Sequence, residues 1–113
     1  MDMQVSELGN NTSCVKLIGR LDSAGVDQGE IRFSAAVVAP GRNTIVDLSG
    51  VSFLASMGIR LFITSARALQ GKGARMVLFA ATPMVQSVLE NVALDRIIPI
   101  VDSQEQAVAR LAS

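Results

Sequence analysis

The chain has 113 residues, half of them hydrophobic, and its ten basic residues balance ten acidic ones. This length fits one domain with enough apolar material to form a core without disulfides or metals. The absence of histidine, the single cysteine and the lack of a basic stripe exclude a Ser-His-Asp triad, a zinc site built from Cys and His, and sequence-independent nucleic-acid binding.

The single cysteine also bears on the compartment. Cys14 cannot form an intrachain disulfide, which fits a reducing environment. The first ten residues do not resemble a signal peptide, and no apolar run approaches the ~20 residues that a membrane-spanning helix needs. We therefore expect a cytoplasmic protein that does not insert into a membrane.

The first third of the chain predicts a hairpin followed by a helix. Residues 3–8 and 12–20 read as strands, and the Gly-Asn-Asn turn between them tolerates positive φ. Asp22 and Ser23 then offer side-chain acceptors to the free amides of a helix over residues 24–38.

The middle third predicts a short strand, a loop and an amphipathic helix. Residues 44–48 form an apolar strand, and residues 49–55 are expected to be a loop. The helix spans residues 57–70, with one apolar face and an exposed side that carries Arg60, Thr64 and Arg67. The apolar face consists of Ile59, Phe62, Ile63, Ala66 and Leu69.

The last third predicts two strands and two helices. Residues 75–80 form a strand, and Thr82 caps a helix that has Pro83 in its first turn and ends near residues 91–94. Residues 97–101 read as a strand, which Pro99 assigns to a sheet edge. Residues 103–106, Ser-Gln-Glu-Gln, form a capping box for the last helix.

The order of these elements defines the fold class. It is β-β-α-β-α-β-α-β-α, which is typical of an α/β domain whose crossovers are right-handed and whose sheet is largely parallel. We expect one domain over residues 1–113, with a mixed sheet of about five strands, four helices and one antiparallel strand from the opening hairpin.

Two carboxylates lie near strand ends, where sites gather in open α/β sheets. Asp22 and Asp47 could form a pair for magnesium or for acid-base chemistry, or could line a nucleotide or small-molecule pocket with Ser49. The alternative is structural: Asp22 caps a helix and Asp47 accepts loop amides. We favour the structural interpretation, and we expect no metal and no cofactor.

Hydrolase and redox chemistry have little support. Ser52 or Ser56 would need an activating base, and no histidine exists to supply it. Cys14 lies in an apolar strand and is expected to be a small buried hydrophobe. We therefore predict a protein that is not an enzyme.

The segment over residues 47–63, DLSGVSFLASMGIRLFI, reads as a binding site. Val51, Phe53 and Leu54 place large apolar groups in the expected loop, where they are either pinned to the body or presented to a partner. Ser56 is predicted to be the N-cap of the helix, and Gly58 permits close approach of another backbone. The helix N-terminus also offers free amides and partial positive charge.

This segment resembles the STAS domain family, typified by the anti-sigma factor antagonists of bacteria. The resemblance rests on an apolar strand, then Asp-Leu-Ser-Gly-Val, then Phe-Leu-x-Ser-x-Gly opening a helix, and on Leu-Ile-Gly-Arg-Leu-Asp over residues 17–22. It extends over essentially the whole chain and implies a protein-binding regulatory module. The partner implied is an anti-sigma factor with a serine-kinase fold, or another protein that recognises STAS domains.

The resemblance also implies which residues bind that partner. They lie in the segment and at the start of the first helix: Asp22, Ser23, Ser49, Phe53, Leu54, Ala55, Ser56, Met57, Gly58, Arg60 and Leu61.

In the family, the partner kinase phosphorylates a hydroxyl in an Asp-Ser-Ser/Thr-Gly motif and so breaks the complex. Aligned on that motif, the acid falls at Ala55 and the usual acceptor at Met57, which cannot be phosphorylated. Three possibilities follow: an antagonist without the usual switch, phosphorylation of Ser56 instead, or a STAS subunit of a transporter or signalling assembly. Phosphorylation of Ser56 is the least favoured, because a capping hydroxyl would be sheltered.

Overall fold

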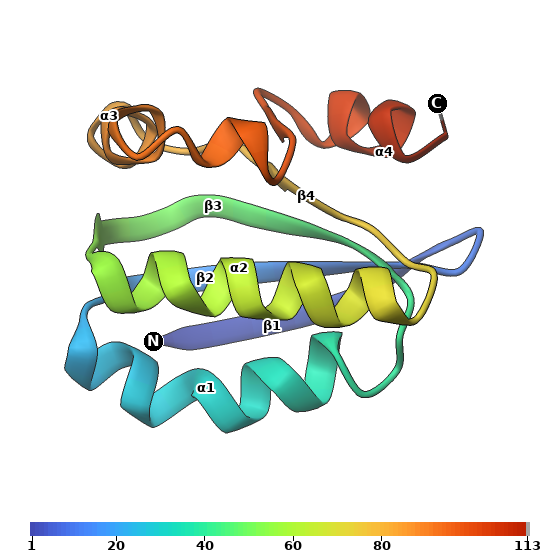
Figure 1. Cartoon of the computed structure of the whole chain (residues 1–113), viewed down its shortest axis with the longest axis horizontal. Coiled ribbons are helices and arrows are strands. Elements are labelled where there is room, and N and C mark those ends of the chain that lie inside the picture. Colours follow the sequence, from blue (N-terminus) through green and yellow to red (C-terminus); the bar gives the residue numbers. More distant parts are fainter. Residues whose placement is uncertain (113) are drawn as a thin grey trace.

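A computed structural model describes residues 1–112 and confirms the predicted order of elements (Figure 1). Its strands are β1 (Asp2–Gly9), β2 (Thr12–Leu21), β3 (Asn43–Leu54), β4 (Met76–Phe79) and β5 (Ile100–Val101). Its α-helices are α1 (Ser23–Val37), α2 (Ser56–Gly71), α3 (Pro83–Asn91) and α4 (Gln104–Ala112), and a 3-10 helix, η1, spans Leu94–Arg96.

The strands form one mixed sheet in the order β1-β2-β3-β4-β5. β1 pairs with β2 in antiparallel fashion, and the other neighbours are parallel, as predicted. The hairpin turn has the positive φ angles that its composition indicated: 84° at Gly9, 49° at Asn10 and 57° at Asn11.

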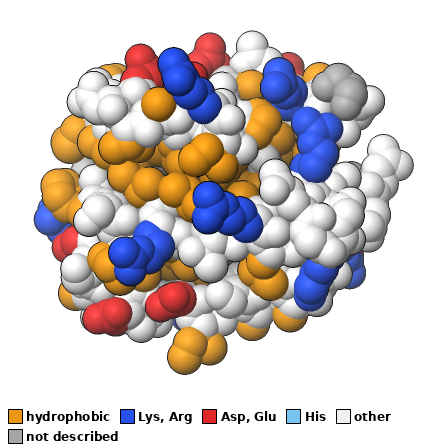
Figure 2. Space-filling model, in the orientation of Figure 1, with side chains coloured by type: hydrophobic (Ala, Val, Ile, Leu, Met, Phe, Trp, Pro, Cys, Tyr) orange, Lys and Arg blue, Asp and Glu red, His pale blue; other side chains and the backbone are white. Residues whose placement is uncertain are grey.

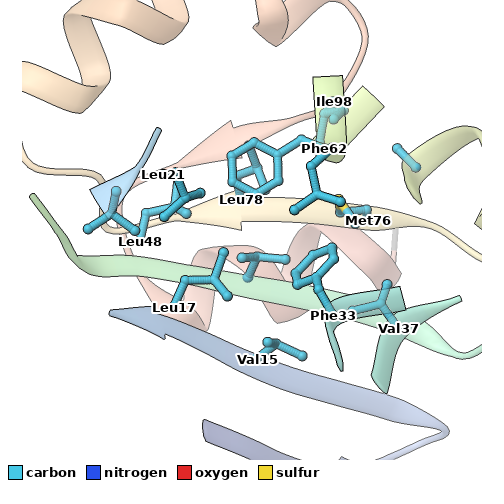
Figure 3. Packing of buried hydrophobic residues seen from close by; sticks show 14 of the residues in the cluster. Val15, Leu17, Leu21, Phe33, Val37, Leu48, Phe62, Met76, Leu78 and Ile98 are labelled. Carbon is cyan, nitrogen blue, oxygen red and sulfur yellow. The ribbon is translucent and has the colours of Figure 1, made fainter. Parts of the chain in front are cut away.

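Helices cover both faces of the sheet. Successive parallel strands move one place in the same direction, so right-handed crossovers put α1, α2 and α3 on one face. Their side chains share one buried cluster, in which Phe33 of α1 and Phe62 of α2 meet edge to face with ring centroids 6.4 Å apart (Figure 3). On the other face, Ala107 of α4 packs in a smaller cluster with Cys14, Ile45, Val77 and Phe79.

Strand β3 is longer than predicted, because residues 49–54 continue the strand and are not a loop. The pairing of β3 with β2 is irregular at two places, and each irregularity adds a residue to β3. These insertions break the alternation of buried and exposed residues, so the usual strand pattern is absent. Gly50 lies at the first irregularity, where a Cβ would be 2.8 Å from the carbonyl oxygen of Leu17.

The last elements of the chain agree with the prediction, except that the final strand is shorter than predicted. β5 covers only Ile100–Val101, because the Ile97 and Ile98 amides donate to the Leu94 carbonyl oxygen of η1 and not to a strand. It lies at a sheet edge as expected. The capping box of α4 is present: the Ser103 hydroxyl accepts from the Gln106 amide at 3.2 Å, and Gln106 Oε1 accepts from the Ser103 amide at 3.1 Å.

The predicted faces of α2 are partly confirmed. Arg60, Thr64 and Arg67 are exposed as expected, and Phe62, Ala66 and Leu69 are buried. However, Ile59 and Ile63 are only half-buried, and Leu61 is buried in their place. None of the helices within residues 1–112 is long and apolar enough to cross a membrane.

Glycine at position 25 is required by the close approach of α1 to the end of β2. A Cβ at Gly25 would lie 2.0 Å from the carbonyl oxygen of Arg20, and backbone cannot move aside cheaply. By contrast, a Cβ at Gly71, at the end of α2, would meet nothing within 4 Å.

We predict that Gly25→Ala lowers the free energy of unfolding by about 2 kcal/mol or more, because the steric conflict outweighs the gain in helix propensity. The matched control, Gly71→Ala, should change it by less than about 0.5 kcal/mol or raise it slightly. Urea denaturation followed by circular dichroism measures both. Equal midpoints for the two variants would show that α1 does not press on β2 as described.

Candidate functional site

The candidate site is a corner at which α2 begins on top of the end of β2. Leu21 pairs with Leu54, and the Ala55 amide donates to the Leu21 carbonyl oxygen at 3.1 Å. Gly58, in the first turn of α2, is buried, and a Cβ there would lie 2.9 Å from Leu21 Cβ and 3.1 Å from its carbonyl oxygen. Gly58 therefore does allow a backbone to come close, but that backbone belongs to the chain itself and not to a partner.

Ser56 occupies a different position from the one predicted. The N-cap of α2 is Ala55, which has extended backbone angles and no capping side chain, and Ser56 is the first helical residue. Within residues 1–112 the Ser56 hydroxyl makes no hydrogen bond to the helix amides, and the residue is exposed. As the first helical residue, Ser56 does not occupy the position from which a side chain caps the free amides. The sheltering that disfavoured Ser56 as a phosphorylation site is therefore absent.

The apolar residues before α2 are pinned to the body. Val51 and Leu54 are buried in the main core. Phe53 is half-buried beneath Arg20, whose guanidinium carbon lies 4.3 Å from the ring centroid.

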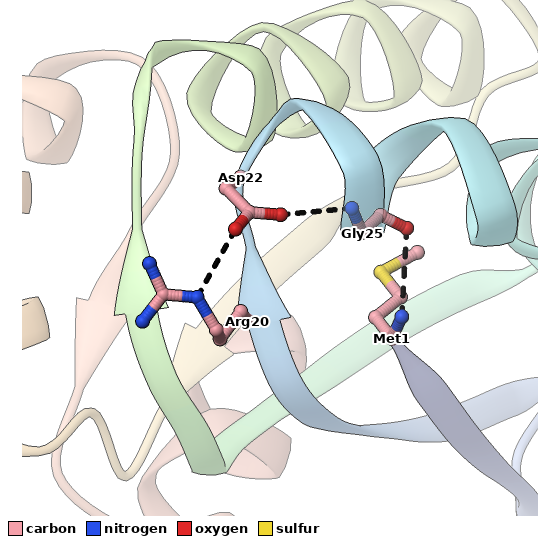
Figure 4. A network of polar contacts seen from close by, with 4 residues as sticks. All are labelled: Met1, Arg20, Asp22 and Gly25. Atoms are coloured by element: carbon pink, nitrogen blue, oxygen red, sulfur yellow. Dashed lines mark hydrogen bonds and ion pairs between the residues drawn. The ribbon is translucent and has the colours of Figure 1, made fainter.

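Arg20 is held on a second side as well, since its Nε donates to the Asp22 carboxylate at 3.0 Å (Figure 4). The arginine is thus fixed by the ring and the carboxylate while its side chain stays 60% exposed.

Asp22 and Asp47 do not form a carboxylate pair. Asp22 caps α1 by accepting from the Gly25 amide at 2.8 Å; this bond and the one from Arg20 lower the pKa of its carboxyl. Asp47 accepts from the Ser49 amide at 2.9 Å and pairs across the sheet with Lys16 of β2. At the usual rise per residue, Lys16 lies about 16 Å along β2 from Leu21, the residue before Asp22, so the two carboxylates are far apart. Asp22 therefore caps a helix as predicted, whereas Asp47 accepts the amide of a strand residue and not of a loop.

The other chemical hypotheses find little support. No group of three His, Cys, Asp or Glu side chains within residues 1–112 is placed to hold a metal ion. A hollow of about 400 Å³ includes Arg20, Asp22 and Gln28 in its wall, but neither Asp47 nor Ser49. Burial raises the pKa of the Cys14 thiol, and the nearby Asp47 adds to the effect, which disfavours the reactive thiolate.

The predicted binding residues divide by exposure. Four are exposed, namely Ser23, Ser49, Ser56 and Arg60, and four are half-buried, namely Asp22, Phe53, Ala55 and Met57. Three are buried, namely Leu54, Gly58 and Leu61, and they shape the corner from beneath. Ser49 lies in the middle of β3, away from the corner.

An exposed apolar patch beside the corner was missed by the sequence prediction. Its residues are exposed or half-buried and lie on α2, on α3 and just after α3: Ile59, Ile63, Met84, Val88 and Val92. Met84 and Val92 are 58% and 50% exposed, and the other three are half-buried against the core. Figure 2 shows hydrophobic side chains gathered on this face, with basic side chains near them.

Two arginines lie beside this helix-face patch on the outer side of α2. Arg60 and Arg67 are exposed, and within residues 1–112 neither makes an ion pair. The sequence signal for the patch was an unusually wide apolar stripe in and just after α3, where Met84, Val88 and Val92 accompany the buried Val85 and Leu89.

The family of the chain follows from its match to known proteins. Residues 3–107 match the STAS domain, and the chain belongs to this family. It is 30% identical over 91 residues to the anti-sigma F factor antagonist of Lysinibacillus sphaericus, covering 80% of this chain and 78% of that protein. The family and this homologue support a regulatory role.

Solved structures confirm the fold. An anti-sigma factor antagonist from Mycobacterium paratuberculosis superposes with a TM-score of 0.88 at 22% identity, covering 99% of this chain and 94% of that one. The Bacillus cell fate determinant SpoIIAA in its phosphorylated form gives 0.69 at 24% identity, with 96% and 98% covered. The murine anion transporter Slc26a9 gives 0.76 at 19% identity; the match covers 90% of this chain but only 18% of the transporter.

Proposed function

We propose that this STAS domain is an anti-sigma factor antagonist that docks a kinase-fold anti-sigma factor through the corner at Ser56–Gly58. The observation that carries the proposal is the exposed, uncapped start of α2 next to a half-buried Met57. The 30% identity to an anti-sigma F factor antagonist adds support.

The chemistry of the corner indicates what the partner presents. Met57 and the helix-face patch offer apolar surface, while Arg60 and Arg67 offer exposed positive charge. A complementary partner surface carries apolar side chains at its centre and acidic side chains at its rim. Arg20, already oriented by Phe53 and Asp22, loses little freedom on binding a further carboxylate.

The corner also suits control by phosphorylation at Ser56. Its hydroxyl is exposed, and a phosphate at a helix N-terminus is locally stabilised by the free amides and the helix dipole. The same phosphate adds about −1.5 to −2 charge to a surface that is otherwise apolar and basic, which would weaken an acidic partner's hold. We therefore favour Ser56 as the switch over an antagonist that has none, since Met57 cannot carry phosphate.

A STAS subunit of a transporter or signalling assembly is the second candidate. The likeness to the STAS portion of Slc26a9 motivates it. In that case the same corner would contact a membrane-transport protein.

We predict that Met57→Glu lowers the affinity for the anti-sigma factor at least tenfold, because a charge replaces an apolar contact at the centre of the interface. The partner is captured from native extract by the tagged wild-type protein and identified by mass spectrometry. Its affinity is then measured by calorimetry.

The matched control is Gln104→Glu, which adds the same charge to the first turn of α4 on the other face of the sheet. It should bind as the wild type does. Equal binding by Met57→Glu would remove the corner as the docking surface, and reproducible capture of a transport complex instead would favour the second candidate.

We further predict that the captured kinase, given ATP, adds the mass of one phosphate to Ser56. Ser56→Ala should abolish the modification, while Ser23→Ala, at the exposed first residue of α1, should not. Binding of the unmodified antagonist without any phosphate transfer would support an antagonist that lacks the switch.

A further inference from the structure

The two edges of the sheet differ in how they are protected. β5 has two residues, follows Pro99 and is packed by α4, which are common ways of blocking further strand pairing. β1 has eight residues and forms the opposite edge. In an antiparallel pair, alternate residues turn their backbone N–H and C=O groups away from the neighbour, so β1 offers a row of such groups at its free edge.

The side chains of β1 do not prevent pairing. Its sequence, DMQVSELG, contains no Lys, Arg or Pro, and every residue except Met3 is exposed. Val5 and Leu8 are 51% and 38% exposed, although both are large and apolar. One of its two acidic residues, Glu7, is paired with Arg42 of the same chain.

We infer that a second copy of this chain pairs with β1 to form a two-fold symmetric dimer with a continuous ten-stranded sheet. An antiparallel partner strand is related to β1 by a two-fold axis normal to the sheet. Directly opposite residues must share a face, so the two strands can only shift in steps of two. The register centred on Val5 pairs residues 2–8 and avoids Gly9, where the pairing with β2 becomes irregular.

This register is complementary in side chains as well as in backbone. Val5 faces Val5 of the second copy, which covers the most exposed apolar residue of the strand. Asp2 faces Leu8, Glu7 faces Met3 and Gln4 faces Ser6, so no like charges lie directly opposite each other.

The inferred interface and the docking residues Ser56–Gly58 belong to different elements. The interface is formed by β1, whereas Ser56–Gly58 and the helix-face patch lie on α2, on α3 and at Val92. The inference is therefore independent of the proposed function, and a dimer would display two docking corners.

Sedimentation velocity tests the inference with the purified chain alone. Between roughly 10 and 500 μM, where interfaces of micromolar Kd become populated, the mass should rise from 11.9 kDa toward twice that value. Val5→Lys should remain monomeric over the whole range. Ile31→Lys, which changes another exposed apolar residue on α1, should dimerise like the wild type. A wild type that stays monomeric at the highest concentration would overturn the inference.

Disulfide trapping tests the register and does not depend on the stability of Val5→Lys. In a Cys14→Ala background, Val5→Cys should cross-link to its copy under mild oxidation, because directly opposite Cα atoms in an antiparallel pair are about 4.5 to 5.5 Å apart, a separation that a disulfide can span. Leu8→Cys faces Asp2 in this register and should not cross-link. Cross-linking of Leu8→Cys but not of Val5→Cys would contradict the arrangement.

Discussion

The contact between the first turn of α2 and the end of β2 determines the rest of the site. Leu21 pairs with Leu54, accepts the Ala55 amide and lies directly beneath Gly58. Any side chain at position 58 would push α2 away from the sheet, and the helix start would move with it. Because this contact is made of backbone and of buried Leu side chains, the exposed residues beside it are held in a fixed arrangement.

That arrangement explains how the proposed docking surface can act. Ser56, Met57 and Arg60 project from a helix start that the core holds in place, and the helix-face patch extends the apolar surface along α2 and α3. Preorganisation of this kind lowers the entropy lost on binding. It also makes the surface sensitive to one added charge, since a phosphate on Ser56 would occupy the centre of the surface and not its rim.

Local signals in the sequence predicted most of the fold. The Gly-Asn-Asn turn, the Asp22 and Thr82 caps and the Ser103–Gln106 capping box each depend on neighbouring residues only, and each is present. The second half of β3 was missed because two irregularities, fixed by its pairing with β2, disrupt the alternation of its side chains. The start of α2 was predicted one residue too late. β3 runs to Leu54 and Ala55 is the N-cap, so Ser56 is the first helical residue.

The helix-face patch was missed because periodicity marks a wide apolar stripe in and after α3 but does not say which of its residues stay exposed, as Met84 and Val92 do. Hydrogen exchange of the chain, free and bound to the anti-sigma factor, tests the docking surface most directly. Binding should slow exchange in residues 55–63 and 84–92 and leave α4 unchanged. Protection confined to α4, with residues 55–63 exchanging as in the free protein, would contradict the account.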